Sequence, residues 1–326
     1  MKKKNIAIIM GGFSNEYDIS IKSGDVVFEH LDSEKYTAYK VLITQNKWVC
    51  LDTDNNEYPI DKSDFSVLLP SKVTFDCVFN AIHGSPGEDG LLTAYFELLG
   101  IPLTSCGYYQ AALTFSKRDL LSVLQPHGIQ SARSFFVDKG DRIDEQSIID
   151  TVGLPCFVKA NRAGSSYGIS KVYNKEELVP AINKAFKEDN EIIIESFLDG
   201  TEVSVGVITY EGKVKVLPMT EIVSENDFFD FEAKYLGKSQ EITPARISEA
   251  IRLKIEGTAQ KVYEVLKLTG FSRSEFIIVE NEPYLLEVNT TPGLTAESIL
   301  PQQAQEAGLS LGELFESSII EALKPR

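Results

Sequence analysis

Residues 5–16 have the sequence NIAIIMGGFSNE, in which a short apolar run ends at two glycines and an acidic residue follows. The apolar run predicts a buried strand, and the residues after it predict a helix over 20–31. The same order returns in a strand predicted at 76–82, a Gly-rich turn at 83–90 and a helix predicted at 91–99. Such alternation is typical of a parallel sheet built from βαβ units. We therefore expect the first third of the chain to form an α/β domain.

Beyond residue 120 the pattern becomes that of an α+β protein. An acidic-Gly pair, Glu211-Gly212, predicts a hairpin turn between two strands. Apolar residues at helical spacing from Ile247 onward predict a long amphipathic helix. The other elements are predicted as strands at 154–160, 169–173, 191–197, 203–210, 213–217, 274–279 and 284–289, and as helices at 175–187 and after 309.

Composition and charge limit the classes of function. The chain has 326 residues and a formal net charge of −16, from 32 lysines and arginines against 48 aspartates and glutamates. An acidic chain is unsuited to neutralising phosphates along a nucleic acid, although small anions need only a local cluster of cations. The four cysteines show no C-x-x-C spacing, so we expect neither a disulfide framework nor a zinc site. No apolar run approaches about 18 residues, and we expect a cytoplasmic protein without membrane contact.

Two strands predicted near the C-terminus, 274–279 and 284–289, carry the most informative polar groups. If they pair through a tight turn, Glu275 lies opposite, or nearly opposite, Glu287, and Asn289 follows on the face of Glu287. Like charges so placed destabilise a sheet unless a cation lies between them. Carboxylate and amide oxygens suit Mg²⁺. Two solvated, outward-facing glutamates fit the same pattern, and geometry alone leaves both interpretations open.

Cationic residues near small, flexible segments are candidates for binding an anion. The turn at 164–168, GSSYG, is flanked by Lys159, Arg162 and Lys171, and its backbone N–H groups can cradle phosphates. A plain β-hairpin is the alternative. The turn also matches the G-x-S-x-G motif of hydrolases, but a strand pattern follows it and all three histidines precede it. Arg273 can bind an anion or neutralise the neighbouring carboxylates.

The remaining candidates are weaker when each is taken alone. Glu195 and Glu202 border an apolar strand end at Leu198, which suits the edge of a base and ribose hydroxyls. Glu16 follows the first Gly-rich turn and can hold a substrate ammonium, or act as a charge favoured at a helix N-terminus. His83 can orient a ligand or donate a hydrogen bond to the backbone within the core.

Together, these segments resemble the D-alanine–D-alanine ligase family of the ATP-grasp superfamily over essentially the whole chain. They occur in the family's order: GGFSNE at 11–16, IHG to EDG at 82–90, Lys159 with GSSYG at 164–168, FDFEAKY at 229–235, RSE at 273–275, and EVNTTPG at 287–293 with Thr295 and Ser298. The resemblance implies an α/β ATP-grasp fold. Its expected parts are an N-terminal parallel-sheet domain at 1–120, a central subdomain at 121–200 and a C-terminal subdomain at 201–326, with ATP between the last two.

The resemblance also implies roles for individual residues. For ATP it implies contacts from Lys117, Lys159, Ser165, Ser166, Glu195, Leu198 and Glu202. For two Mg²⁺ ions, with Mn²⁺ as an alternative, it implies Glu275, Glu287 and Asn289. For catalysis it implies Glu16, Ser165, Lys234, Tyr235, Arg273 and Gly293, and for substrate binding Glu16, His83, Arg273, Ser298 and Ile299.

The implied reaction joins two D-alanines for peptidoglycan precursor synthesis. ATP converts the first D-alanine to D-alanyl phosphate, and the amine of the second displaces phosphate. In this reaction the protein positions the reactants and stabilises their charges. It requires no nucleophilic side chain. The resemblance implies a cytoplasmic homodimer formed through the first domain. A ligase making D-alanyl-D-serine or D-alanyl-D-lactate is the alternative, although Tyr235 disfavours lactate, and a catalytically silent nucleotide-binding protein is a third.

Four residues depart from the family's pattern, and one of them, Phe231, stands where the family frequently has a tyrosine. Ala160 and Ala163 stand where the family usually has proline and glutamate, so how the phosphate loop is held is an open question. Glu275 stands where the first metal ligand is usually an aspartate and is one methylene longer. None of these departures removes a proposed catalytic group.

Overall fold

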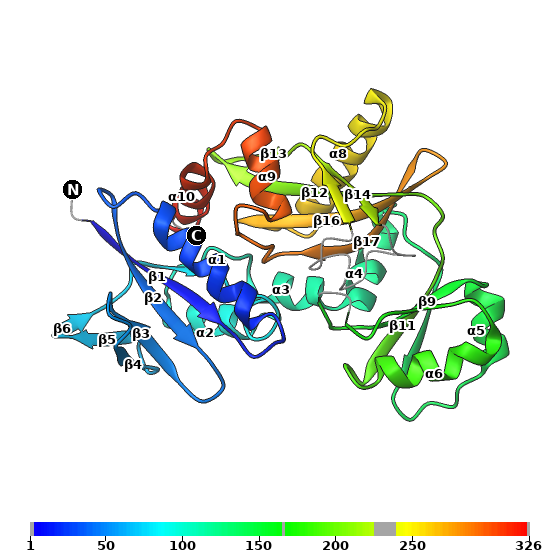
Figure 1. The fold of residues 1–326 in the computed structure, drawn as a ribbon, viewed down its shortest axis with the longest axis horizontal. Coiled ribbons are helices and arrows are strands. Elements are labelled where there is room, and N and C mark those ends of the chain that lie inside the picture. The colour runs from blue at the N-terminus through cyan, green and yellow to red at the C-terminus, as the bar shows by residue number, and fades with distance from the viewer. Residues whose placement is uncertain (1–2, 165–166, 225–238, 325–326) are drawn as a thin grey trace.

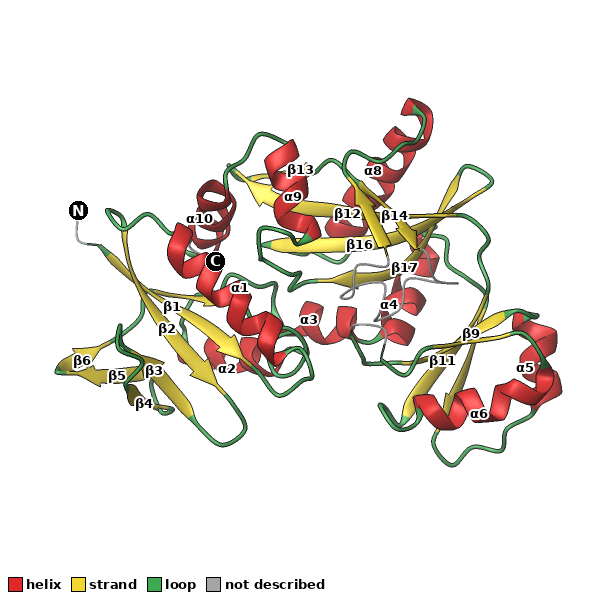
Figure 2. Ribbon diagram, viewed as in Figure 1, coloured by secondary structure: helices red, strands yellow, loops and turns green. Residues whose placement is uncertain are grey.

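The computed structural model describes residues 3–164, 167–224 and 239–324. Its strands form three β-sheets, which lie at the left, upper centre and right of Figure 1, with helices between and around them. Figure 2 shows the same mixture of helices and strands along the whole chain. The mixed α/β architecture is the one expected from the sequence.

The first sheet has the N-terminal strand at its parallel centre. β1 (Lys4–Gly11) pairs in parallel with β2 (Tyr36–Ile43) on one side and with β7 (Cys77–Asn80) on the other. α1 (Tyr17–His30) follows β1, and α2 (Leu91–Leu99) lies beyond β7 in the chain. The strands and helices predicted in this region are therefore confirmed.

An antiparallel extension, which the sequence analysis did not predict, continues the first sheet beyond β2. Its strands are β3 (Trp48–Leu51), β4 (Glu57–Asp61), β5 (Ser66–Leu69) and β6 (Ser71–Val73). Each contains three to five residues, so each offers too few alternations to be distinguished from a loop. The first sheet is therefore mixed. The two strands that lead into the Gly-rich turns, β1 and β7, belong to its parallel part.

The second sheet is antiparallel, with strand order β10-β9-β11-β8. Its strands are β8 (Ser134–Asp138), β9 (Cys156–Ala160), β10 (Ser170–Val172) and β11 (Glu191–Ser196), and its helices are α5 (Glu145–Val152) and α6 (Lys175–Ala185). The elements predicted between 154 and 197 are confirmed, whereas β8 and α5 were not predicted.

The third sheet has the order β15-β14-β12-β16-β17, with β13 paired to β12. Its strands are β12 (Thr201–Tyr210), β13 (Lys213–Val216), β14 (Thr220–Ser224), β15 (Ser239–Ile242), β16 (Phe271–Val279) and β17 (Glu282–Asn289). The helices around it are α3 (Tyr108–Phe115), α4 (Lys117–Leu124), α8 (Glu249–Val265), α9 (Ile299–Glu306) and α10 (Leu311–Ala322), and a short 3₁₀ helix (Gln125–His127) follows α4. The predicted hairpin at Glu211-Gly212 and the long helix are confirmed.

The hairpin of β16 and β17 contains a register shift that decides which side chains face one another. Its turn residues have positive φ angles, 51° at Glu280 and 65° at Asn281, as a tight two-residue turn requires. Near the turn Phe276 pairs with Leu285, but the next pair is Glu275 with Glu287, so Leu286 is an extra, bulged residue. The prediction that the two glutamates lie opposite each other is confirmed.

Two hydrophobic cores join segments that lie far apart in the sequence. One combines Leu120 of α4 with Val203 of β12 and Phe276 of β16. The other combines Ile8 of β1 with Phe315 of α10, and Figure 1 shows α10 beside α1 at the edge of the first sheet. The C-terminal helices therefore cover the N-terminal sheet and hold the third sheet against it.

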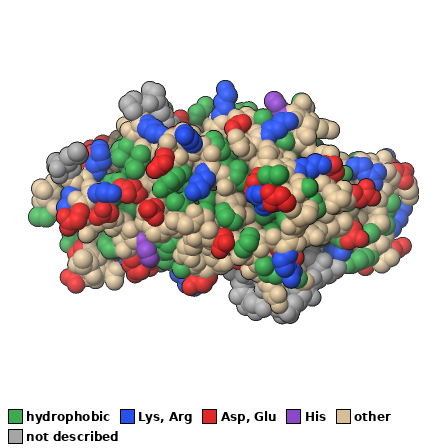
Figure 3. Space-filling view, turned by 90° about the horizontal axis from the view of Figure 1, so that it is seen from above, with side chains coloured by type: hydrophobic (Ala, Val, Ile, Leu, Met, Phe, Trp, Pro, Cys, Tyr) green, Lys and Arg blue, Asp and Glu red, His purple; other side chains and the backbone are tan. Residues whose placement is uncertain are grey.

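The surface shown in Figure 3 carries lysine and arginine side chains scattered among aspartates and glutamates. Among the helices in the described part of the chain, none has the length and apolar character needed to cross a membrane.

We predict that Phe315→Ala destabilises the whole chain. The Phe315 side chain is fully buried, and its ring meets that of Phe79 edge to face at 5.8 Å between centroids. The truncation is expected to lower the free energy of unfolding by about 3–5 kcal/mol, measured by urea denaturation. Ile320→Ala on the same helix, where the side chain is 51% exposed, is the control and is expected to change stability by less than about 1 kcal/mol.

Candidate active site

Two cavities meet in the middle of the molecule. The first, about 380 Å³, lies between α1 and the loop after β17, and we call it the α1 cavity. The second, about 470 Å³, lies between the second and third sheets, and we call it the β9 cavity. Both are lined by Lys117, Arg273 and Glu287, so these side chains form the junction between the cavities.

Lys117 joins three segments at this junction. Its ammonium lies 3.1 Å from Oε2 of Glu287 and donates a hydrogen bond of 3.0 Å to the carbonyl of Ala163. The residue is the first of α4, which is capped by Ser116. The β17 carboxylate, the start of α4 and the loop after β9 are therefore held around one buried cation.

The neighbouring pair, Arg273 and Glu275, lies on β16. Nε of Arg273 is 2.8 Å from Oε1 of Glu275, and the hydroxyl of Ser204 donates to the same oxygen at 3.2 Å. Glu275 pairs directly with Glu287, and Arg273 pairs with Asn289. Each of the two facing carboxylates thus has a cation beside it, which reduces the cost of placing like charges opposite each other.

The residues proposed as metal ligands come together as the sequence predicted. Glu275 and Glu287 share one face of the hairpin, and Asn289 lies two residues beyond Glu287. Oδ1 of Asn289 accepts a hydrogen bond of 2.8 Å from the backbone N–H of Thr291, which orients the amide. Two carboxylates with an amide oxygen are a donor set that fits Mg²⁺. Within residues 3–164, 167–224 and 239–324, no group of three or more His, Cys, Asp or Glu side chains is arranged to hold a metal ion.

The β9 cavity contains a buried ion pair. The Lys159 ammonium lies 2.6 Å from Oε2 of Glu195, and both side chains are almost completely enclosed. Burial lowers the pKa of Lys159, but the Glu195 carboxylate outweighs it, so the pKa lies above its ordinary value and the amine stays charged. Leu198 and Glu202 line the same cavity. Of the seven residues that the resemblance implies for ATP, the structure therefore brings five to one cavity: Lys117, Lys159, Glu195, Leu198 and Glu202.

Glu16 lies where two glycine-rich segments approach each other in the α1 cavity. A Cβ atom added at Gly164 would lie 2.8 Å from Oε2 of Glu16, and one added at Gly84 would lie 3.5 Å from it. The Glu16 side chain does not cap α1 by a hydrogen bond. It lines the α1 cavity and is also the N-cap residue of α1, so this placement is compatible with an ammonium-binding carboxylate and with a charge at a helix N-terminus.

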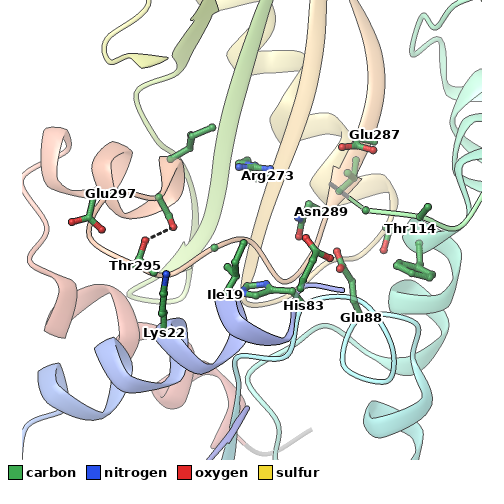
Figure 4. A pocket seen from close by; sticks show the side chains of 18 of the residues that line it. Ile19, Lys22, His83, Glu88, Thr114, Arg273, Glu287, Asn289, Thr295 and Glu297 are labelled. Carbon is green, nitrogen blue, oxygen red and sulfur yellow. Dashed lines mark hydrogen bonds between the residues drawn. The ribbon is translucent and has the colours of Figure 1, made fainter. Parts of the chain in front are cut away.

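His83 is held by the protein through both of its ring nitrogens. Nδ1 lies 2.7 Å from the carbonyl of Thr291, and Nε2 lies 3.0 Å from the hydroxyl of Ser23. Burial lowers the pKa of His83, so the ring is neutral near pH 7. Because a carbonyl only accepts, Nδ1 carries the proton and Nε2 accepts from Ser23. The ring lines the α1 cavity, as Figure 4 shows, and also ties α1 to the loop after β17.

The loop after β17 leads into α9 at the far end of the α1 cavity. Ser298 is the N-cap residue of α9, and its hydroxyl lies 2.9 Å from that of Thr295, the pair joined by a dashed line in Figure 4. A Cβ atom added at Gly293 would lie 2.7 Å from the Ser298 hydroxyl, so a larger residue there would displace the Ser298 side chain. Gly293, Ser298 and Ile299 all line the α1 cavity.

Four charged residues that line the α1 cavity were not among the predicted site residues: Lys22, Glu88, Glu241 and Glu297. Lys22 reaches it from α1, and Glu88 reaches it from the Gly-rich turn after β7 (Figure 4). Burial raises the pKa of Glu88 to about 8, repulsion from Glu16 adds to the shift, and the backbone N–H of Gly84 donates to its carboxyl at 3.0 Å. The position of Glu88 within the turn at 83–90 was the available signal, since that turn was already predicted to be a site loop.

Four predicted site residues are not placed by the structure. Ser165, Ser166, Lys234 and Tyr235 lie outside the described residues. Their proposed roles therefore rest on the sequence resemblance alone.

Comparisons with known proteins agree over the length of the chain. A family model described as D-ala D-ala ligase N-terminus matches residues 5–106, and one described as D-ala D-ala ligase C-terminus matches residues 123–321. The chain is 65% identical to the D-alanine–D-alanine ligase of Flavobacterium johnsoniae, covering 97% of this chain and 98% of that protein. It is 59% identical to that of Christiangramia forsetii, covering 99% of this chain and 100% of that protein.

Solved structures give the same result for the fold. The D-Ala:D-Ser ligase VanG of Enterococcus faecalis superposes with a TM-score of 0.86 at 31% identity, covering 98% of this chain and 100% of that one. The D-alanine–D-alanine ligase of Bacillus anthracis in complex with ATP superposes with a TM-score of 0.80 at 26% identity, covering 98% and 97%. The fold class predicted from the sequence, an ATP-grasp α/β fold, is confirmed.

We predict that Glu88 makes stability fall as pH rises. Between its unfolded pKa near 4.5 and its folded pKa of about 8, the folded state binds more protons than the unfolded state. Glu88→Gln removes this proton uptake, so its stability relative to the parent is expected to increase between pH 5 and 8, by up to about 1.4 kcal/mol per pH unit. Urea denaturation across that range measures the difference. The exposed Glu34→Gln is the control, and parallel curves for parent and Glu88→Gln would contradict the prediction.

Proposed function

The chain belongs to the D-alanine–D-alanine ligase family, and we propose that its two joined cavities bind ATP on one side and two D-alanine molecules on the other. As a member of this family it is an ATP-dependent ligase that joins two D-alanines into D-alanyl-D-alanine. The observation that carries the proposal for the site is the junction itself. Lys117, Arg273 and Glu287 belong to both cavities, so a phosphoryl group can pass from one to the other among fixed charges.

We assign the β9 cavity to ATP. The backbone beyond Glu195 and the apolar wall at Leu198 suit the adenine edge, and Glu202 suits the ribose hydroxyls. Lys159 and Lys117 supply cations for the phosphates, with Ser165 and Ser166 of the neighbouring loop as further contacts. Lys159 is paired with Glu195 in the structure, so its charge is maintained in a buried place where an unpaired ammonium would lose its proton.

Glu275, Glu287 and Asn289 are the residues proposed to hold two Mg²⁺ ions, with Mn²⁺ as an alternative. Such ions would neutralise the charge of the transferring phosphoryl group. The two carboxylates are already drawn to one place by Arg273 and Lys117. These cations lie beside donor oxygens that line the β9 cavity.

The α1 cavity is assigned to the two D-alanines. Glu16 is proposed to accept the ammonium of the first, with the His83 ring beside it. Transfer of the γ-phosphoryl group of ATP to the carboxylate of the first D-alanine gives D-alanyl phosphate and ADP. The neutral amine of the second D-alanine then adds to the acyl carbon, and the tetrahedral intermediate expels phosphate and loses the amine proton. Arg273 and the backbone at Gly293 are proposed to stabilise the oxyanion of the tetrahedral intermediate. Ser298 and Ile299, at the start of α9, are proposed to bind the carboxylate of the second D-alanine.

Two further residues complete the proposed machinery. Tyr235 would join Ser165 and Glu16 in a hydrogen-bonded group that covers the first D-alanine. Lys234 would reach the transferred phosphate. Exclusion of water from the acyl phosphate is the physical purpose of such a cover, because water would hydrolyse it.

The proposed location is the cytoplasm, and the proposed pathway is peptidoglycan precursor synthesis. ATP is a cytoplasmic substrate, and the four cysteines are buried free thiols, which suits a reducing compartment. The product, D-alanyl-D-alanine, is a peptide building block for the cell wall, and cell-wall assembly would depend on its supply.

We predict that Glu287→Gln raises the Mg²⁺ concentration needed for half-maximal activity by at least about tenfold, because it removes a charged ligand. Phosphate release from ATP is measured with D-alanine alone and with D-serine or D-lactate added as acceptor. The parent protein is expected to release phosphate with D-alanine alone and to form D-alanyl-D-alanine. Glu282→Gln, on the same strand but paired at the surface with Lys254, is the control. A parent protein active only with D-serine or D-lactate as acceptor would contradict the assignment.

We also propose a homodimer formed through α2 and α3. Leu91 and Leu98 lie seven residues apart on one face of α2 and are 62% and 88% exposed, and Tyr108 at the start of α3 is 53% exposed. Neighbouring exposed apolar side chains are typical of association surfaces. Leu98→Glu is therefore expected to halve the molar mass measured by light scattering. Leu253→Glu, at a 55% exposed position of α8, is the control, and a monomeric parent protein would contradict the dimer.

A further inference from the structure

Asn161 is a completely buried polar residue at the root of the Gly164–Gly168 loop. It follows β9 directly and lies two residues after Lys159. Its side-chain oxygen accepts a hydrogen bond of 3.0 Å from the backbone N–H of Arg118. Its side-chain nitrogen donates to the Ser116 hydroxyl at 3.0 Å and to Oε2 of Glu191 at 2.9 Å. This amide therefore joins the end of β9 to the start of α4 and to β11.

These contacts give the backbone N–H groups at the start of α4 hydrogen-bond partners within the protein. The first N–H groups of a helix have no partner inside the helix and often bind an anion. Here the N–H of Lys117 lies 3.3 Å from the carbonyl of Asn161, and that of Arg118 bonds the Asn161 side chain. The N–H of Asp119 bonds the Ser116 hydroxyl at 3.4 Å. The backbone at this helix end is thus already used, and the Lys117 side chain is the group that α4 offers to an anion.

The same residue sets where that side chain lies. The N–H of Asn161 donates to the carbonyl of Glu191 at 2.9 Å, so the root of the loop is fixed to β11. The Arg118 guanidinium, also buried, bonds the carbonyl of Ile192 and pairs with Asp138 at 2.6 Å, so α4 is fixed to the same sheet. With both segments held, the Lys117 ammonium reaches the carbonyl of Ala163 and the carboxylate of Glu287.

We propose that Asn161 is a positioning residue for ATP, which fixes the Lys117 ammonium relative to that of Lys159 by docking α4 onto the end of β9. The inference rests on the proposed function, in which both lysines contact phosphates. It also answers how the phosphate loop is held in a chain with Ala160 and Ala163 where the family usually has proline and glutamate. The Asn161 side chain and the Lys117–Ala163 hydrogen bond hold the root of the loop instead.

A double-mutant cycle tests whether Asn161 acts through Lys117. Binding of ATP is measured by calorimetry in the absence of D-alanine, for the parent chain, Asn161→Ala, Lys117→Ala and the double variant. Asn161→Ala is expected to weaken ATP binding about tenfold in the parent background and less than about twofold in the Lys117→Ala background. In turnover assays the KM for ATP is expected to rise, while the KM for D-alanine changes less than about twofold.

The control removes an exposed asparagine that lies outside the strands, between β10 and α6. Asn174 is the N-cap residue of α6 and lines neither cavity, so Asn174→Ala is expected to leave ATP binding unchanged. Equal weakening by Asn161→Ala in both backgrounds would overturn the proposal, because the residue would then act by general packing. Unchanged ATP binding in Lys117→Ala alone would instead show that the proposed function misassigns Lys117, and the proposal would fall with it.

A second pair of variants keeps the test decisive if Asn161→Ala does not fold. Asn161→Asp has the same size and still accepts from the N–H of Arg118, but it cannot donate to Ser116 or to Glu191. It is expected to weaken ATP binding, and adding Glu191→Gln is expected to restore most of the loss, since the glutamine amide donates to the new carboxylate. A folded Asn161→Asp variant that Glu191→Gln does not rescue would overturn the proposal.

Discussion

The bulge at Leu286 is the constraint on which the site depends. In an unbroken hairpin with the observed turn, Glu275 would face Leu286, and Glu287 would project from the opposite side of the sheet, because side chains alternate along a strand. The extra residue shifts the register by one and places both carboxylates on one face. Two like charges then face each other in a partly buried place, so the structure must supply cations. Arg273 and Lys117 do so from either side.

These cations come from different parts of the chain, and this requirement explains how the sheets are assembled. Arg273 belongs to the same hairpin, but Lys117 begins α4, which packs into the core of the third sheet through Leu120 and is also bonded to the second sheet through Arg118. α4 therefore connects two sheets that could otherwise move independently. The buried pair of Lys159 and Glu195 adds a second charge-compensated contact on the far side of the junction.

Much of this arrangement could be predicted from the sequence because it depends on local patterns. The strand before Gly11 and Gly12, the hairpin turn at Glu211-Gly212 and the long α8 follow from periodicity and turn chemistry. The short strands β3 to β6 could not be predicted in the same way, since three to five residues give no reliable period. Glu88 was also missed as a site residue, because its raised pKa arises from burial and, to a lesser extent, from repulsion by Glu16, and neither follows from a local pattern.

The sequence by itself determined the residue types of the site, their order, and the family that this order resembles. Tertiary structure decided which of these residues share a space. The bulge put Glu275 and Glu287 on one face, the docking of α4 brought Lys117 to them, and the packing of α1 against the loop after β17 placed Glu16 and His83 in the same cavity as Ser298. The physical reason is that a charged group keeps its charge when buried only if a partner comes within a few ångströms. Such partners are supplied by segments distant in the chain.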